Sequence, residues 1–428
     1  MTSKCDVPSI ESSDGKLAVL IPGLGAVGTT VIAGAMAIRK GLAEPTGSLA
    51  QMGRLRGEDP EDAKPLIREA IPLARLSDLA FGGWDIFDAD CYESAIDAGV
   101  LERNHLELVR DELSQIEPMS AVFDPAYVPN IDGPNVKETS TKMEAAEALI
   151  SDIRRFMERT DSDRAVAVWC GSTEVHRPIG ATHESIEAFE EGLERNDETI
   201  SPTMIYAYAH IRAGVPFMVG APNHATDCQA LVELAEQEGV PIAGRDFKTG
   251  QTFLKTALAP ALAARKLGVR GWYSTNILGN RDGQVLDDPG CFKSKEMSKL
   301  SVLESIFEPE LNGDLYGDLD HQVRIDYYAP RGDNKEGWDN IDLTGRMDYE
   351  MQVKVDFLCR DSILAAPLVL DLALFGDLAN RAGLSGLQEW LSFYFKDPET
   401  PTGRRPIHDL FRQREMLLDQ LHRFEKTV

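Results

Sequence analysis

The segment FKSKEMSK, residues 292–299, places Lys293, Lys295 and Lys299 close together in a chain whose formal net charge is −26. If the segment is helical, Lys295 and Lys299 lie four positions apart on one face, where like charges repel and weaken the helix. Burial or a neighbouring ammonium lowers the pKa of a lysine toward neutrality, and a protonated lysine stabilises negative charge on oxygen. The cluster is therefore a candidate for proton transfer or for binding an anionic ligand.

A glycine-rich turn, GLGAVG at residues 23–28, fits the dinucleotide-binding pattern GxGxxG. It follows a predicted buried strand and precedes a predicted Ala-rich helix that runs to about residue 40. Gly23 would permit the tight turn, Gly25 would let the backbone approach a pyrophosphate, and Gly28 would let helix and strand pack closely. A turn that serves packing alone is the alternative.

An acidic ligand for the ribose is expected about 20 residues after such a turn. Glu44 is the nearest candidate, and it is a weak one. The loop FGGWDIFDAD at 81–90 places Asp85 after two glycines, and the apolar run AVAVWCGSTE at 165–174 ends in a turn that contains Ser172 and Thr173. The second of these is predicted to be a parallel strand whose carboxyl end opens on a crevice.

Two further loops combine glycine with polar side chains. GRDFKTGQT, residues 244–252, could surround an anion with backbone N–H groups together with Lys248, Thr249 and Gln251. NILGNRDG, residues 276–283, follows a predicted strand. Each loop alone could equally be an ordinary turn, but their number favours a functional site.

The composition limits the classes of function. With 428 residues, 43% hydrophobic and 27% charged, the chain is predicted to form two domains or one domain with a large insertion. A sequence pI near 4.7 argues against a nucleic-acid partner. The six cysteines and eight histidines lack metal-ligand spacing, so a zinc site is not expected. No membrane helix or signal segment is predicted, and a cytoplasmic location is expected.

The predicted elements fall into three stretches. Strand and helix signals alternate from the N-terminus through VRGWYSTNI, which predicts a doubly wound, mostly parallel α/β sheet. From about Leu311 the segments HQVRIDYY and MQVKVDF alternate, which predicts antiparallel strands with one wet face. After Asp361 the chain is predicted to be helical again.

Taken together, these loops resemble the myo-inositol-1-phosphate synthase family over most of the chain. The segments that carry the resemblance occur in the family's order and are TGSLAQMGRLR, FGGWDIFDAD, CGSTEV, SPTMIYAYAHIRAGVPFMVGAPN, GRDFKTGQTFLK, NILGNRDG, FKSKEMSK, GDNK, CRDSILAAPLVLDL and FYFK. The resemblance implies conversion of glucose 6-phosphate to inositol phosphate, with NAD oxidised and reduced within one turnover. It also implies oxidation at C5, enolisation, aldol closure of the ring and return of hydride.

Carried over residue by residue, the resemblance implies a catalytic set of lysines and one aspartate. Lys295 and Lys396 are assigned to proton transfer, Lys299 and Lys335 to stabilising oxyanions, and Asp361 to orienting a lysine. The implied cofactor positions are Gly23, Gly25, Ala26, Val27, Gly28, Asp85, Ser172, Thr173, Asp246 and Asp282. The implied phosphate positions are Lys248, Thr249, Gly250 and Gln251, while Arg245 stands where the family usually has an acidic residue. A monovalent or divalent cation is left open, with no ligands assigned.

The resemblance also implies a domain plan and an assembly. A Rossmann-type NAD-binding domain is expected at 1–243 and 357–428, with an inserted α+β catalytic and tetramerisation region at 244–356. Two alternatives stay open. A net NAD-dependent dehydrogenase of a sugar or polyol phosphate would share the dinucleotide features but accumulate NADH, and a catalytically silent nucleotide-binding scaffold would have no chemical reason to keep the lysines.

Overall fold

The structure is a computed structural model that describes residues 10–55, 65–401 and 404–426. Within these residues a seven-stranded parallel sheet has the order β11-β6-β5-β4-β1-β2-β3. The order of its first six strands along the chain is that of a Rossmann dinucleotide-binding sheet, which confirms the predicted fold class. The strands are β1 (Lys16–Pro22), β2 (Leu79–Asp85), β3 (Met119–Ser120), β4 (Ser162–Trp169), β5 (Phe217–Val219), β6 (Pro241–Gly244) and β11 (Gly386–Leu387).

Helices cover both faces of this sheet, because its strands carry apolar side chains on both sides. In β1, Leu17 and Val19 point into one buried core and Ala18 and Leu20 into the other. The first core includes residues of α1 (Ala26–Arg39), α15 (Asp361–Arg381), η5 (Glu389–Tyr394) and α16 (Leu410–Glu425). The second includes residues of α7 (Lys142–Thr160), α8 (Ile186–Glu194), α9 (Pro202–Arg212) and α10 (Gln229–Gln237).

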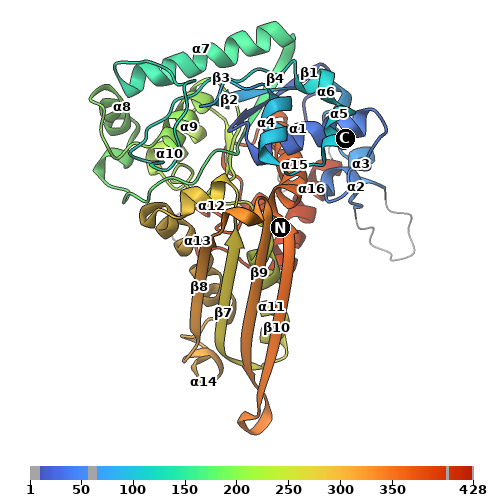
Figure 1. Ribbon diagram of the computed structural model, residues 1–428, viewed down its shortest axis with the longest axis vertical. Coiled ribbons are helices and arrows are strands. Elements are labelled where there is room, and N and C mark those ends of the chain that lie inside the picture. Colours follow the sequence, from blue (N-terminus) through green and yellow to red (C-terminus); the bar gives the residue numbers. More distant parts are fainter. Residues whose placement is uncertain (1–9, 56–64, 402–403, 427–428) are drawn as a thin grey trace, which may run out of the picture.

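A second sheet, with the order β10-β9-β7-β8, lies along the chain between β6 and α15 and extends away from the first sheet (Figure 1). Its strands are β7 (Gly268–Leu278), β8 (Asp320–Tyr327), β9 (Asn334–Thr344) and β10 (Glu350–Arg360). Its core combines Trp272 and Ile341 of the sheet with residues of α11 (Gly250–Ala264) and α13 (Pro289–Phe307).

Short helices make the connections between these layers. They are α2 (Leu49–Met52), α3 (Ile67–Ala70), η1 (Leu76–Asp78), α4 (Cys91–Ala98), α5 (Arg103–Glu107), α6 (Arg110–Leu113), η2 (Ala181–His183), α12 (Arg281–Leu286), α14 (Gly313–Tyr316), η3 (Ala329–Arg331) and η4 (Arg346–Asp348). Because β10 ends at Arg360 and α15 begins at Asp361, the last strand of the second sheet leads directly into a helix that packs on the first.

Three expectations about the second sheet are corrected. The strand VRGWYSTNI, β7, is a central strand of the second sheet and not part of the parallel alternation. β9 is antiparallel to β7 and β10, but β8 pairs with β7 in parallel, since α12 and α13 supply the long crossover that a parallel pair needs. β8 and β10 are also largely exposed on both faces, because they are the two edge strands.

One helix in the described part of the chain, α15, is long and apolar enough to cross a membrane by length and composition. Most of its apolar window, 72%, is buried inside the protein, as in the core helix of a globular domain. Its one deeply buried acidic residue in the middle, Asp371, accepts hydrogen bonds from Ser48 Oγ and from the backbone N–H groups of Leu49 and Ala50. This contact fixes the loop TGSLAQ against the core.

Candidate active site

A cavity of about 440 Å³ lies at the carboxyl ends of β1, β2, β4 and β5 and reaches the junction with the second sheet. The volume falls within the range of small-molecule sites, and the position is where open α/β sheets bind ligands. The predicted site residues that line it are Gly23, Gly25, Ala26, Val27, Asp85, Ser172, Thr173, Asp246, Thr249, Asp282, Lys295, Asp361 and Lys396.

The glycine turn has the geometry that a dinucleotide requires. Gly23 has φ +96°, and a Cβ there would lie 2.5 Å from the backbone nitrogen of Gly171. A Cβ on Gly25 would meet nothing within 4 Å, so this backbone faces open space, while one on Gly28 would lie 2.6 Å from the Gly23 oxygen. α1 begins at Ala26, so its N-terminal N–H groups face the cavity and can hold a pyrophosphate.

Asp85 occupies the place of the acidic ribose ligand. It is the last residue of β2, the strand beside β1, and it lines the cavity. Burial raises the pKa of its carboxyl, whose Oδ1 accepts from Phe87 N at 3.1 Å. Asp85 lies well beyond the expected spacing of about 20 residues from the turn because α2 and α3 separate α1 from β2. Glu44, the candidate at that spacing, is exposed and does not line the cavity.

Ser172 and Thr173 follow β4, and two side chains that the sequence did not single out hold their loop. Asn223 Nδ2 donates to the Ser172 oxygen at 2.9 Å, and its Oδ1 accepts from Glu174 N at 2.9 Å. Glu174 in turn accepts from Thr203 N, and burial raises the pKa of its carboxyl to about 7. Asn223 lies in the turn VGAPN after β5, which is the signal that could have identified it.

Asp246, which the resemblance placed among the cofactor positions, lies instead between two of the predicted catalytic lysines. Its Oδ1 accepts from Lys295 Nζ at 2.8 Å and from Lys396 Nζ at 3.2 Å. All three side chains are buried. Burial alone would raise the pKa of Asp246, but the two ammonium groups lower it to about 2.

The pKa values of the two lysines that share Asp246 are shifted in opposite directions. Burial lowers the pKa of Lys396, and the opposing effect of Asp246 does not restore it, since Lys295 is also close. Burial would likewise lower the pKa of Lys295, but Asp246 and then Asp282 raise it above its usual value. Lys396 therefore gives up a proton more easily, and Lys295 keeps one.

A second ion pair joins the two sheets. Lys335 Nζ donates to Asp361 Oδ2 at 2.9 Å, as the assignment of Asp361 to orienting a lysine requires. Lys335 lies at the start of β9 and Asp361 at the start of α15, which brings them together across the β9–β10 pairing. Although burial opposes it, Asp361 raises the pKa of Lys335, and Lys335 with Lys396 holds the pKa of Asp361 well below its usual range.

The predicted phosphate loop is divided by the structure. Thr249 precedes α11 and lines the cavity, and Gly250 follows with φ +59°. Gln251 instead donates to the Thr275 oxygen and to Asp339 at 3.1 and 3.0 Å, which ties α11 to the second sheet. Lys248 turns away from the cavity and donates to Gln413 of α16, and burial lowers its pKa to about 7. Lys299 lies in α13, but its side chain lies outside the described residues.

The fold and the cavity define a Rossmann-type dinucleotide protein with buried lysines at the junction of two sheets. The family model for myo-inositol-1-phosphate synthase matches residues 17–422, and the chain belongs to this family. It is 52% identical to inositol-3-phosphate synthase 1 of Bacteroides thetaiotaomicron over 96% of each chain. It is 32% identical to inositol-3-phosphate synthase of Mesembryanthemum crystallinum over 94% of this chain and 84% of the plant protein.

A solved structure agrees with this assignment. The crystal structure of inositol-3-phosphate synthase from Caenorhabditis elegans superimposes with a TM-score of 0.90 at 27% identity. The match covers 98% of this chain and 86% of that one. The similarity therefore extends over both sheets and not over the dinucleotide fold alone.

Proposed function

We propose that this chain is an inositol-3-phosphate synthase, an isomerase that converts D-glucose 6-phosphate to 1D-myo-inositol 3-phosphate. The observation that supports the proposal best is Asp246 between two buried lysines in the wall of a cavity that begins at a dinucleotide turn. A dehydrogenase needs the turn, but it does not need several buried lysines to enolise a ketone and close a ring.

The residues present fit NAD. The open backbone at Gly25 and the N-terminus of α1 would hold the pyrophosphate, Asp85 would accept from the ribose hydroxyls, and Ser172 and Thr173 line the cavity further in. When bound, NAD supplies reversible hydride acceptance at C5 of the sugar, so that the reaction has no net redox change.

The chain's own lysines would move the protons. Oxidation at C5 acidifies the protons on C6, and Lys396, with its lowered pKa, is the proposed base that removes one of them. Lys295 stays protonated beside Asp246 and would stabilise the enolate and alkoxide oxygens, returning a proton when the ring closes. This sharpens the sequence-based assignment, which gave proton transfer to both.

The remaining assignments complete the site. Lys335, held by Asp361, would add positive charge near the developing oxyanion, and Lys299 stays a predicted oxyanion stabiliser. Thr249 and the N-terminal N–H groups of α11 would bind the substrate phosphate. No group of three or more His, Cys, Asp or Glu side chains that could hold a metal is found within the described ranges, and we assign no residue to a cation.

We also propose that the chain divides into an NAD-binding domain (1–243 and 357–428) and an inserted region (244–356). We further propose that the protein is a cytoplasmic homotetramer and that its product serves phospholipid synthesis. The edge strand β10 supports the assembly. Tyr349, Met351 and Leu358 on or beside it are exposed at 71%, 45% and 61%, and an uncovered apolar edge strand favours pairing with another copy. Light scattering coupled to gel filtration would test the tetramer, and a monomeric mass would reject it.

Incubation with glucose 6-phosphate and catalytic NAD tests the activity. Phosphorus NMR should show inositol phosphate accumulating over many turnovers per NAD, with no rise in NADH absorbance. NADH that rises in step with an oxidised sugar phosphate would instead establish the net dehydrogenase. No conversion, with NAD still raising the melting temperature, would favour the silent scaffold.

A further inference from the structure

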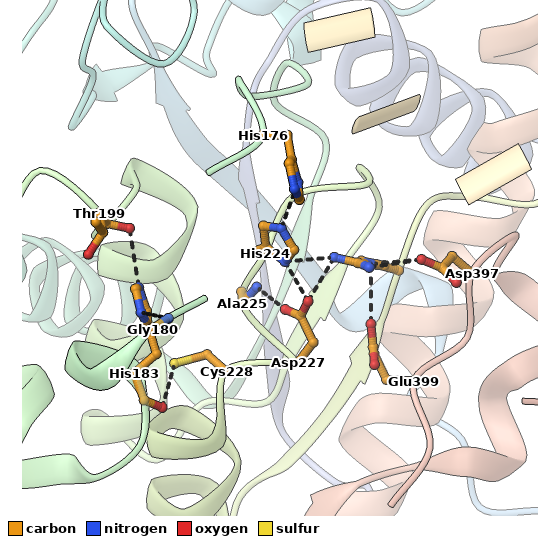
Figure 2. Close-up of polar contacts among 11 residues, drawn as sticks. His176, Gly180, His183, Thr199, His224, Ala225, Asp227, Cys228, Asp397 and Glu399 are labelled. Carbon is orange, nitrogen blue, oxygen red and sulfur yellow. Dashed lines mark hydrogen bonds and ion pairs between the residues drawn. The ribbon is translucent and has the colours of Figure 1, made fainter. Parts of the chain in front are cut away.

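Arg245, the neighbour of Asp246, lies at the centre of a buried ion network that the proposed chemistry does not use. Its guanidinium donates to Asp227 at 2.9 Å and to Asp397 at 2.9 Å, and it lies 3.2 Å from Glu399. Arg245 Nη1 also lies 3.0 Å from His224 Nδ1. Figure 2 shows the side chains of His224, Asp227, Asp397 and Glu399 gathered in one cluster.

The network connects loops from the carboxyl edge of the first sheet. His176 follows β4, His224 and Asp227 follow β5, and Arg245 follows β6. His176 Nδ1 and His224 Nε2 lie 3.0 Å apart, and His224 Nδ1 lies 2.5 Å from Asp227 Oδ2 (Figure 2). The fourth segment, 396–399, comes from beyond η5 and carries Lys396.

The backbones of the third and fourth of these segments, after β6 and after η5, pair directly. Arg245 N donates to the Asp397 oxygen at 2.9 Å, and Asp397 N donates to the Arg245 oxygen at 3.2 Å. On either side, Lys396 N donates to the Asp246 oxygen at 2.6 Å and Glu399 N to the Gly244 oxygen at 2.9 Å. The side-chain network therefore clamps the same two segments that bring Lys396 Nζ to Asp246.

Two further observations show that the local structure depends on this network. Asp246 has φ +63°, a left-handed conformation that a residue with a side chain rarely adopts without support. Three carboxyl groups also surround one guanidinium. Burial raises the pKa of Glu399 to about 8 and also raises the pKa of Asp397. Arg245 holds the pKa of Asp227 well below its usual range. Removing the guanidinium would leave these carboxyls without their shared cation.

We propose that Arg245 is a positioning residue that holds segment 396–399 against the end of β6 and so fixes the contact between Lys396 and Asp246. The inference deepens the proposed function, on which its kinetic readout rests. The fork of the guanidinium is essential to this role, because it reaches Asp227 in one direction and Asp397 with Glu399 in the other.

The test compares Arg245→Lys and Arg245→Gln with matched changes at Arg212. Arg212 of α9 also joins two carboxylates, Glu190 at 2.5 Å and Glu238 at 2.6 Å, but neither belongs to the segments that meet at Asp246. Each variant is assayed well below its own melting temperature. Both Arg245 variants should lower kcat by about 10- to 100-fold, the cost of a displaced reacting group, with KM for glucose 6-phosphate changed far less.

The pH profile separates positioning from stability. Burial lowers the pKa of Lys396 most, and the charged groups that act on it are Asp246, Lys295, Asp361 and Lys335. If Asp246 moves away, Lys396 loses the main group that raises its pKa, so the acid limb of kcat should move to lower pH in the Arg245 variants. Arg212→Lys and Arg212→Gln should lower the melting temperature without moving this limb.

A crystal structure of Arg245→Gln makes the inference testable without activity. A lengthened contact between Lys396 Nζ and Asp246 supports it even if the wild-type protein fails to convert glucose 6-phosphate, which would reject the proposed function alone. An unchanged contact overturns it. So does an active wild type whose Arg245 variants lose melting temperature but keep kcat and the wild-type pH profile.

Discussion

Two lysine–carboxylate groups at the cavity differ in the number of lysines that share one carboxylate, and their carboxylates, Asp246 and Asp361, line it. In the Asp246 group, one carboxylate accepts from two ammonium groups, Lys295 and Lys396. In the Asp361 pair, one carboxylate accepts from Lys335. Lys396 and Lys335 are both buried, so burial alone does not explain why the pKa of Lys396 falls while that of Lys335 rises.

The difference follows from the number of lysines that share each carboxylate. A lysine with its own carboxylate recovers the cost of burial, since the opposite charge favours the protonated form. Two lysines on one carboxylate also repel each other, and here Lys295 is supported by Asp282 as well, so the deficit falls on Lys396. The site thus combines one labile proton with two retained ones, which suits enolisation followed by oxyanion stabilisation.

The largest effect is expected at the labile proton. Lys396→Met removes the proposed base, and kcat should fall by about 10²- to 10⁴-fold, the usual contribution of a positioned acid or base. NAD should still raise the melting temperature as in the wild type, because the glycine turn and Asp85 are unchanged. A variant that keeps more than a tenth of the wild-type kcat would show that Lys396 is not the base.

Removing the shared carboxylate should cost less and change the pH dependence. Asp246→Asn is expected to lower kcat by about 10²-fold, since both ammonium groups lose their fixed partner. Asp246 raises the pKa of Lys396, so its loss lowers that pKa further and more of the free base is present at low pH. The acid limb of the kcat profile should therefore move to lower pH. A limb that moves to higher pH would contradict this account of Lys396.

The Asp361 pair should respond in the opposite direction. Lys335→Met removes a cation that lowers the pKa of Lys396, so that pKa rises and the acid limb should move to higher pH. We expect kcat to fall by about 10- to 100-fold, as for the loss of one group that stabilises an oxyanion. Measuring both variants in one buffer series makes each the control for the other, and shifts in the same direction would remove the distinction between the two groups.

The sequence predicted one of these groups better than the other. Asp361 was predicted to orient a lysine that was not named, and its Oδ2 accepts from Lys335 Nζ at 2.9 Å. Asp246 was named, but not as the partner of Lys295 and Lys396. The three residues lie after β6, on α13 and after η5, and no local sequence pattern indicates that they meet. Lys248 was predicted to bind the substrate phosphate, but it donates to Gln413 on the last helix, a partner that no local pattern indicates either.

The fold was more predictable than these contacts, for a physical reason. The run LAVLIP and the turn GLGAVG specify a strand, a turn and a helix through local burial and backbone freedom alone. The pairing of β7 with β8 in parallel depends instead on how the helices between them pack, which the alternation of side chains in HQVRIDYY does not encode.

The smallest effect is expected at Asp85, a carboxylate in the same cavity that belongs to neither of the two lysine–carboxylate groups. Asp85 takes its raised pKa from burial, with Arg281 as a weaker opposing charge and no lysine among the causes. Asp85→Asn should weaken NAD binding by about tenfold, or about 1.4 kcal/mol, the scale of one hydrogen bond to a charged group. Wild-type affinity for NAD should fall as pH drops through the raised pKa of Asp85, because the ionised carboxylate is the better acceptor. Asp85→Asn should lose that dependence, and the acid limb of its kcat profile, which Lys396 sets, should stay as in the wild type. Calorimetric titration of NAD at several pH values would measure it, and equal affinities for both proteins would place the ribose elsewhere in the cavity.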